Sequence, residues 1–284
     1  MQDEFAKSTY SQYIHSFFKS VFHAGKEILA IYNGGKYGVT FKDDSSPLTK
    51  ADLASHSIIK TELSKAFPDL PLMSEEGKSI AYEERRNWDL YFCIDPLDGT
   101  KEFIKRNGEF TINLALIEKQ RPVVGVVYVP VKDILYIGGS GLGSYRIHDF
   151  SKTYTELNGM ISLRNGIEKL PLPSINNVFT VIGSRSHMNK ETEAFIHKLK
   201  KKYNTLNIVS AGSSLKFCLI AEGTADVYPR FAPTMEWDTA AGQAIVEGIG
   251  GSVINVKNQC VLTYNKHQLL NPSFIVYSGE FETE

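Results

Sequence analysis

The sequence predicts a mixed α/β fold, in which helices and strands are joined by turns rich in Gly and Pro. Apolar residues recur at helical spacing over residues 10–32. Residues 110–117 and 122–129 alternate in polarity or are rich in Val, which is typical of antiparallel strands. We therefore expect an N-terminal α+β domain at residues 1–150, with a mixed and largely antiparallel sheet. A smaller C-terminal α/β domain is expected at residues 151–284.

The individual elements follow from the same patterns. The first helix ends at Gly34 and Gly35, because Gly commonly terminates helices, and its aromatic residues are expected either in the core or on a dimer surface. A second helix is expected over 52–66 and a buried strand over 90–94. The remaining expected elements are strands at 110–117, 122–129, 134–137, 178–182, 206–209 and 225–228, helices at 189–202 and 239–247, a helix that follows Gly212-Ser213-Ser214 and ends at Glu222, and strands near Val253 and Phe274.

Composition narrows the class of protein. The chain has 284 residues, of which 42% are hydrophobic and 22% charged, and its net charge is −1. This balance does not indicate a nucleic-acid polymer as a partner, and no apolar stretch is long enough to cross a bilayer. The first four residues lack the pattern of a signal peptide.

The cysteines point to a reducing compartment. Cys93, Cys218 and Cys260 are widely spaced and form no Cys-x-x-Cys pair. We expect reduced, buried thiols without a chemical role, in a cytoplasmic protein. Peripheral attachment to the inner face of the membrane and assembly into a homodimer both stay open. Trp88 and Trp237 are expected to be packing residues.

The most informative segment, residues 95–103, reads Asp-Pro-Leu-Asp-Gly-Thr-Lys-Glu-Phe and follows the buried strand. It places two carboxylates, Asp95 and Asp98, where that strand is expected to end and the chain to turn. Gly99 permits backbone angles that other residues resist. Two acids held this close repel each other unless a proton or a cation lies between them. Oxygen ligands of this kind suit Mg²⁺.

Each of these acids also has a plainer interpretation. Asp95 and Asp98 could form a solvated turn, and Glu75 could be a solvated acid in an acidic loop. Asp238 and Asp52 could each be the N-cap of the helix that follows, because Asp is favoured at that position.

Three separated motifs resemble the inositol monophosphatase superfamily of Mg²⁺-dependent, lithium-inhibited phosphomonoesterases. Glu75 lies in a Ser-Glu-Glu segment, residues 95–100 read Asp-Pro-Leu-Asp-Gly-Thr, and residues 237–242 read Trp-Asp-Thr-Ala-Ala-Gly. The resemblance covers nearly the whole chain. It implies a layered αβαβα sandwich of the sugar and inositol phosphatase type.

Within that superfamily, the likeness is strongest to the CysQ-type 3′(2′),5′-bisphosphate nucleotidases. It rests on Lys-Glu-Phe at 101–103, Gly-Ser-Arg-Ser-His at 183–187, Gly-Ser-Ser-Leu-Lys at 212–216, and Arg230.

The resemblance implies two or three Mg²⁺ ions per site. One ion would be held by Glu75, Asp95 and the carbonyl of Leu97, and a second by Asp95, Asp98 and Asp238. In two-metal sites the ions lie about 3.5–4 Å apart and hold the attacking and leaving oxygens. Four carboxylates would balance two dications before the substrate enters.

The resemblance also implies that Thr100 and Asp52 position the attacking water as a hydrogen-bonded pair. Contact of Asp52 with a further metal ion stays open. The polar loop at residues 43–47 is expected to gate the metal ions.

The second phosphate of a nucleotide bisphosphate should meet cations and hydroxyls away from the metals. Lys216, Arg230, Ser213 and His187 match nucleotide-contacting positions of the bisphosphate nucleotidases. The plainer interpretations are an N-cap for Ser213, an exposed first-turn residue for Lys216, a pair with Glu236 for Arg230 and a surface turn for His187. The full set of expected substrate-binding residues is Glu75, Leu97, Asp98, Gly99, Thr100, His187, Ser213, Lys216, Arg230 and Asp238.

We therefore expect a Mg²⁺-dependent phosphatase that removes the 3′-phosphate of adenosine 3′,5′-bisphosphate (PAP), giving AMP and phosphate. Its sulfated analogue (PAPS) is a further expected substrate, and the cellular role would be in sulfur metabolism. Two alternatives stay open. One is an inositol monophosphatase or sugar bisphosphatase with the same mechanism, and the other is a non-catalytic regulator that binds metal or nucleotide.

Overall fold

The computed structural model describes residues 5, 8–35, 37–42, 47–156, 166–173, 178–184 and 189–279. Its helices within these ranges are α2 (Ser11–Gly34), α3 (Lys50–Ala66), α4 (Tyr82–Arg85), α5 (Thr100–Ile104), the 3₁₀ helix η1 (Pro130–Lys132), α6 (Phe150–Glu156), α7 (Lys190–Lys202), α8 (Leu215–Glu222) and α9 (Glu236–Gly248). Its strands are β1 (Thr40–Phe41), β2 (Pro47–Leu48), β3 (Leu72–Ser74), β4 (Leu90–Asp98), β5 (Thr111–Glu118), β6 (Arg121–Val129), β7 (Ile134–Gly139), β8 (Gly143–Ile147), β9 (Ile167–Lys169), β10 (Phe179–Ser184), β11 (Leu206–Ala211), β12 (Val227–Arg230), β13 (Ser252–Asn255) and β14 (Phe274–Tyr277).

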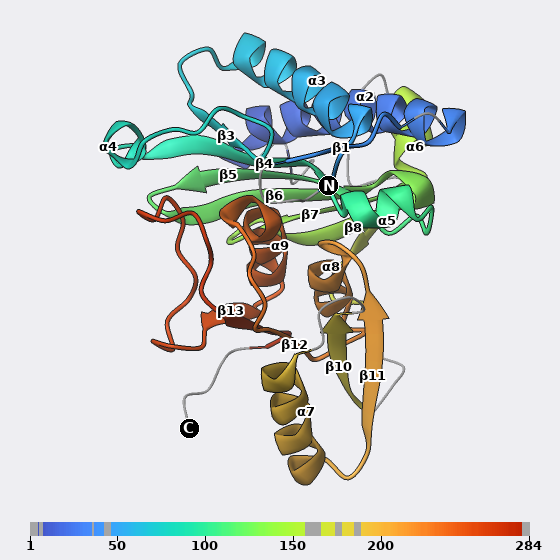
Figure 1. Ribbon diagram of the computed structural model, residues 1–284, viewed down its shortest axis with the longest axis vertical. Helices are drawn as coiled ribbons and strands as arrows, with labels where there is room; N and C mark the ends of the chain where they lie inside the picture. The colour runs from blue at the N-terminus through green and yellow to red at the C-terminus, as the bar shows by residue number, and fades with distance from the viewer. Residues whose placement is uncertain are drawn as a thin grey trace.

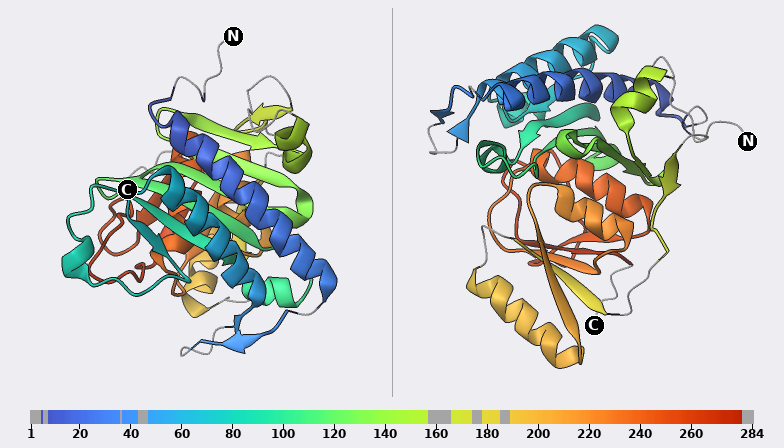
Figure 2. Two further views of the ribbon diagram at one scale, coloured as in Figure 1. Left: turned by 90° about the horizontal axis from the view of Figure 1, so that it is seen from above. Right: turned by 90° about the vertical axis from the view of Figure 1, so that its right-hand side faces the viewer.

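The helices and sheets alternate in five layers (Figures 1 and 2). Helices α2 and α3 cover one face of the larger sheet, and α8 and α9 lie between that sheet and the smaller one. Helix α7 covers the outer face of the smaller sheet, where Ile196 packs with Val181 and Val227. The predicted αβαβα sandwich is therefore confirmed.

The larger sheet has seven strands in the order β3-β4-β5-β6-β7-β8-β9. β3 pairs with β4 in parallel, and the later pairs are antiparallel, so the expected meander is confirmed. The smaller sheet has five strands in the mixed order β11-β10-β12-β14-β13. The division of the chain near residue 150 stays a prediction, since β9 still pairs with β8 and the smaller sheet begins with β10.

Helix α9 packs closely on the larger sheet because the contact residues are small. A Cβ atom at Gly125 of β6 would lie 2.2 Å from the carbonyl oxygen of Ala241 in α9. On the other side of α9, a Cβ atom at Gly242 would lie 2.4 Å from Cγ of Phe217 in α8. These contacts fix the helix whose first turn carries Asp238.

The aromatic residues of α2 lie in the core, where Phe17 and Phe18 are fully buried, so the first of the two alternatives for that helix is confirmed. Trp88 and Trp237 pack against a core cluster, as expected. Cys93 and Cys218 are buried, but the prediction for Cys260 is wrong, because it is exposed in the turn after β13. Across the described ranges, no helix combines the length and apolar character needed to cross a membrane.

Candidate active site

Strand β4 carries Asp95 and Asp98 at an irregularity in the sheet. Asp95 pairs with Asn113 of β5 and Asp98 pairs with Thr111, with a register shift between them. The expected end of the strand before Asp95 is wrong, because the strand continues to Asp98 through this bulge. A bulge tolerates Pro in a strand, since the ladder is interrupted there. Leu97 lies in the bulge, and its amide donates to Oδ1 of Asp95 at 3.0 Å.

Gly99 then turns the chain into α5. Its φ of +93° lies in the left-handed region, as expected for the glycine of this motif. The turn places Thr100 as the first residue of α5.

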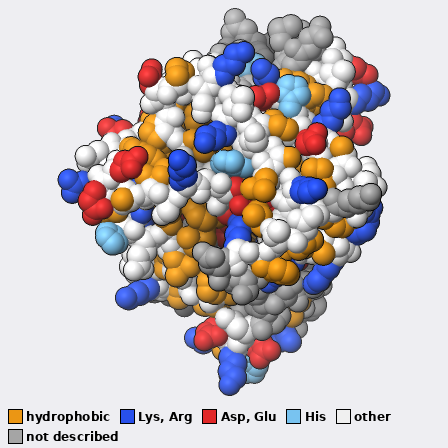
Figure 3. Space-filling model, turned by 45° about the horizontal axis from the view of Figure 1, so that its top comes forward, with side chains coloured by type: hydrophobic (Ala, Val, Ile, Leu, Met, Phe, Trp, Pro, Cys, Tyr) orange, Lys and Arg blue, Asp and Glu red, His pale blue; other side chains and the backbone are white. Residues whose placement is uncertain are grey.

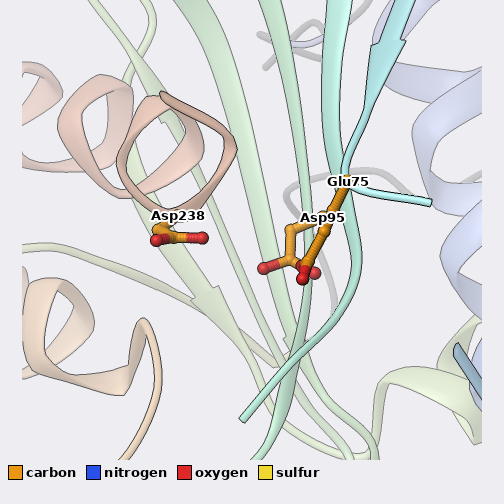
Figure 4. Close-up of side chains that lie close together, drawn as sticks. All are labelled: Glu75, Asp95 and Asp238. Carbon is orange, nitrogen blue, oxygen red and sulfur yellow. The ribbon is translucent and has the colours of Figure 1, made fainter. Parts of the chain in front are cut away.

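Three acids from distant parts of the chain come together. Glu75 follows β3, Asp95 lies on β4, and Asp238 lies in the first turn of α9. One carboxylate oxygen from each lies within 4.8 Å of the others. Figure 4 shows Glu75 and Asp95 side by side, with Asp238 facing them from the helix. Hereafter these three residues are called the acidic cluster.

Asp98 does not belong to this cluster, but it lies next to it. A cavity of about 230 Å³ has Asp98 in its wall together with Glu75 and Asp238. The residues in this wall that can bind a cation or a phosphate, or position a water, are Glu75, Asp98, Thr100, Lys216, Arg230 and Asp238. In Figure 3, acidic side chains lie in a central hollow with a basic side chain beside them.

The electrostatics of the cluster favour a bound cation. Burial raises the pKa of Asp95 well above its usual value, and the charges of Glu75, Asp98 and Asp238 raise it further. Removal from bulk water and the charge of Asp98 raise the pKa of Asp238 to about 8, against the hydrogen bond from the Met235 amide. A divalent cation among these oxygens would relieve both the like-charge repulsion and the cost of burial. The oxygen-only donor set fits Mg²⁺.

A lysine partly neutralises the cluster. Lys42 donates from Nζ to Glu75 Oε1 at 2.7 Å and to Glu76 Oε1 at 2.6 Å. Burial lowers the pKa of Lys42, but these two acids outweigh it and raise the pKa above its usual value. Residues 43–46, which hold most of the loop expected to gate the metals, lie outside the described residues.

The expected N-cap alternatives are wrong for both Asp52 and Asp238. Helix α3 begins at Lys50 with Thr49 as its N-cap, and α9 begins at Glu236 with Met235 as its N-cap. Each Asp is the third residue of its helix and accepts a hydrogen bond from the N-cap amide, at 2.8 Å in both cases. One carboxylate oxygen of each Asp therefore anchors the start of its helix, and the other oxygen can contact other groups.

Asp52 and Thr100 meet as predicted. The Thr100 hydroxyl donates to Oδ1 of Asp52 at 3.0 Å, while Oδ2 accepts from the Thr49 amide and hydroxyl. Asp52 is buried, which raises its pKa, although the three hydrogen bonds oppose that shift. The structure thus brings together two residues that are 48 positions apart in the chain.

Two cations, Lys216 and Arg230, line the same cavity and are called the cationic pair. Lys216 is only 7% exposed, so its interpretation as an exposed residue is wrong. Its Nζ atom donates to the carbonyl oxygen of Ser213 at 2.5 Å and lies 5.6 Å from the ring centre of Tyr228. Burial lowers the pKa of Lys216 to about 8, although the charge of Asp98 opposes the shift.

The N-cap interpretation of Ser213 and the expected pair of Arg230 with Glu236 are also wrong. Ser214, not Ser213, occupies the N-cap position of α8. Glu236 is fully buried and pairs with Lys266 at 2.6 Å, whereas Arg230 donates to the carbonyl of Pro233. His187 lies outside the described residues.

Comparisons with known proteins identify the family of this chain. The sequence profile of the inositol monophosphatase family matches residues 10–282. The chain belongs to the inositol monophosphatase family. Members of this family generally depend on Mg²⁺, which is consistent with the acidic cluster.

Similar proteins include the 3′(2′),5′-bisphosphate nucleotidase CysQ of Salmonella typhimurium, which is 42% identical over 89% of this chain and 95% of its own length. The crystal structure of CysQ from Bacteroides thetaiotaomicron aligns with a TM-score of 0.85 and 46% identity, covering 96% of this chain and 100% of that one. An IMPase of Thermotoga maritima shares the fold, with a TM-score of 0.70 at 23% identity over 92% of this chain and 90% of that one.

Proposed function

We propose that this protein is a Mg²⁺-dependent 3′(2′),5′-bisphosphate nucleotidase. It hydrolyses the 3′-phosphate of adenosine 3′,5′-bisphosphate to AMP and phosphate, and it accepts the sulfated analogue. The single observation that carries this proposal is the cavity that Glu75, Asp98 and Asp238 line together with Lys216 and Arg230. A substrate with two phosphates matches such a site, and the names of the CysQ relatives support a nucleotide.

The acidic side would hold two or three Mg²⁺ ions. Glu75, Asp95 and the Leu97 carbonyl would hold one, and Asp95, Asp98 and Asp238 a second. When bound, such ions neutralise the oxygens of the transferring phosphoryl group and lower the pKa of a bound water. The substrate phosphate would meet the same side of the cavity, next to Gly99 and Thr100.

Thr100 and Asp52 would prepare the attacking water. The Thr100 hydroxyl donates a hydrogen bond to Asp52, so the lone pairs of its oxygen are left to accept a hydrogen bond from water. The water oxygen would then attack phosphorus while a proton moves through Thr100 toward Asp52. In the balanced reaction, the ribose 3′-oxygen leaves with a proton, and phosphate takes the water oxygen.

Lys216 and Arg230 would hold the second, unreacted phosphate, with Ser213 beside them. Phosphate binds strongly to such groups because charged hydrogen bonds are about twice as strong as neutral ones. Lys216 is buried and forms no ion pair with a described carboxylate, so a phosphate dianion at this position would be favoured. His187 is included in this proposal on the strength of its motif.

A phosphate-release assay tests the proposal. The assay would compare adenosine 3′,5′-bisphosphate, inositol 1-phosphate and fructose 1,6-bisphosphate, each with Mg²⁺ and with or without lithium. We expect the nucleotide to be hydrolysed fastest, with inhibition by lithium. Faster release from either of the other substrates would replace this proposal with the corresponding phosphatase. No release from any of the three would favour the regulator.

A further inference from the structure

The hydroxyl groups of Ser213 and Ser214 converge on one oxygen of Asp98. Each donates to Oδ2 of Asp98 at 2.8 Å. Among the described residues, no hydrogen bond reaches Oδ1 of Asp98. Ser213 has a φ of +52°, in the left-handed region that residues with a side chain seldom occupy.

The hydrogen-bond partners of Ser214 are unusual for a helix N-cap residue. It occupies the N-cap of α8, where a Ser hydroxyl ordinarily accepts from a backbone amide of the first turn. No such capping hydrogen bond is present. Ser214 instead lies between Asp98 Oδ2 at 2.8 Å and the main-chain carbonyl of Asp238 at 3.0 Å. Ser214 is 2% exposed, and its hydroxyl contacts two residues of the acidic side, Asp98 and Asp238.

Asn113 fixes the direction in which the Ser214 proton points. Its Nδ2 donates to Oγ of Ser214 at 2.9 Å, and its Oδ1 accepts from the Thr111 hydroxyl at 2.8 Å. Because the Asn113 amide already supplies a proton to Ser214 Oγ, Ser214 can only donate to Asp98 or to Asp238. The charged carboxylate of Asp98 is the stronger acceptor. Nδ2 of Asn113 also lies 3.5 Å from Asp98 Oδ2.

We propose that Ser214 is a positioning residue for Mg²⁺, and that Asn113 sets its orientation. Ser214 holds Oδ2 of Asp98 and thereby leaves Oδ1 for the cation. It also links Asp98 of β4 to the backbone of Asp238 at the start of α9, a link that Ser213, the other hydroxyl on Asp98, does not make. The inference rests on the proposed function, because it assumes that Asp98 and Asp238 bind a metal.

Ser214→Ala tests this role by isothermal titration of Mg²⁺ into the metal-free protein. Residues that orient metal ligands typically contribute about 10–100-fold to metal affinity, so we expect Kd for Mg²⁺ to rise about tenfold or more. The matched control is Ser144→Ala. Ser144 is also fully buried and donates to the carbonyl of Ile245 in α9 at 2.6 Å, but it lies on β8. This control should leave the Mg²⁺ affinity unchanged, whatever its effect on Tm.

A double-mutant cycle tests the role of Asn113. Because Asn113 acts through Ser214, Asn113→Leu should weaken Mg²⁺ binding, and the double variant should bind no more weakly than the poorer single variant. Additive effects in the cycle would overturn the role of Asn113. Mg²⁺ affinity within twofold of wild type in both Ser214→Ala and Asn113→Leu would overturn the whole inference. If the wild-type protein itself bound no Mg²⁺ and released no phosphate, the proposed function would fail instead.

Discussion

The two sides of the cavity differ in how completely their charges are compensated. On the acidic side, Asp95 accepts one described backbone hydrogen bond, from the Leu97 amide, and is surrounded by further acids. On the cationic side, Lys216 already donates to a backbone carbonyl and Arg230 to another. The acidic side therefore needs an added cation to be stable in its charged form, whereas the cationic side is already held by hydrogen bonds to the backbone and lacks only the anion that it would bind. We infer that the first determines whether chemistry occurs and the second determines which substrate is used.

The largest expected effect is the loss of a shared acid. Asp95→Asn keeps the oxygen that accepts from the Leu97 amide but removes the charge. Metal ions contribute several kcal/mol to such reactions, and about 1.4 kcal/mol corresponds to a tenfold change in rate. We expect kcat/KM for adenosine 3′,5′-bisphosphate to fall by about a thousandfold or more, measured by phosphate release.

Folding provides the control for that variant. Because Asp95→Asn removes one of several like charges, the Tm of the metal-free protein should not fall. Activity within tenfold of wild type at saturating Mg²⁺ would contradict the shared role of Asp95.

Removal of the Thr100 hydroxyl should have the next largest effect. Thr100→Val keeps the shape of the side chain but loses the hydrogen bond to Asp52. General acid–base catalysis contributes about 10²–10⁴-fold, so kcat should fall by at least about a hundredfold. Thr100→Ser keeps the hydroxyl and should retain most of the activity. Equal losses in the Val and Ser variants would show that packing, and not the hydroxyl, is what matters.

A change on the cationic side should alter substrate choice and leave the chemistry intact. Hydrogen bonds to charged groups contribute about 1.5–3 kcal/mol, which corresponds to about 10–100-fold in kcat/KM. Lys216→Met should therefore lower kcat/KM for adenosine 3′,5′-bisphosphate by that factor. Adenosine 3′-monophosphate lacks the second phosphate, so its hydrolysis should change by less than about threefold. A similar loss with both substrates would place Lys216 in the chemical step and break the comparison.

The smallest expected effect is that the preference for adenosine 3′,5′-bisphosphate over adenosine 3′-monophosphate depends on pH. Lys216 has a pKa of about 8, lowered by burial and by Arg230, and raised by Asp98, Glu102 and Asp238. The lysine loses its charge as the pH rises through this value. The ratio of kcat/KM for the bisphosphate to that for the 3′-monophosphate should fall roughly fourfold between about pH 7 and about pH 8.5.

The ratio cancels the titration of groups that act on both substrates. Lys216→Arg keeps its charge over this range, so the decline should disappear in that variant. If the ratio fell by the same factor in Lys216→Arg, the pH dependence would come from a group other than Lys216.

The sequence predicted the acids and their chemistry better than it predicted their local structure. The N-cap interpretation failed for Asp52 although Thr49 and Asp52 have the spacing of a capping box, so a usable signal was present. For Asp238 no such signal existed, because Met235 occupies the N-cap. Three-residue strands such as β3 and β9 are too short to show periodicity.

The convergence of distant residues could be inferred only from family resemblance. Ser214 and Asn113 are 101 residues apart, and nothing in the pattern around either one indicates the other. Their contact depends on how the smaller sheet and α8 pack against the larger sheet, which is a property of the tertiary fold. Exposure of Cys260 is likewise set by a turn whose path the local sequence did not reveal.

The most direct test of the account is to locate the bound cations. Mn²⁺ substitutes for Mg²⁺ at oxygen sites and gives an anomalous X-ray signal, so crystals of the wild-type protein soaked in Mn²⁺ would show where the metal binds. We predict anomalous peaks among the carboxylates of Glu75, Asp95 and Asp238, and their loss in Asp95→Asn. Hydrolysis supported by Mn²⁺ in a protein whose ordered Mn²⁺ ions lie away from these three acids would contradict the account.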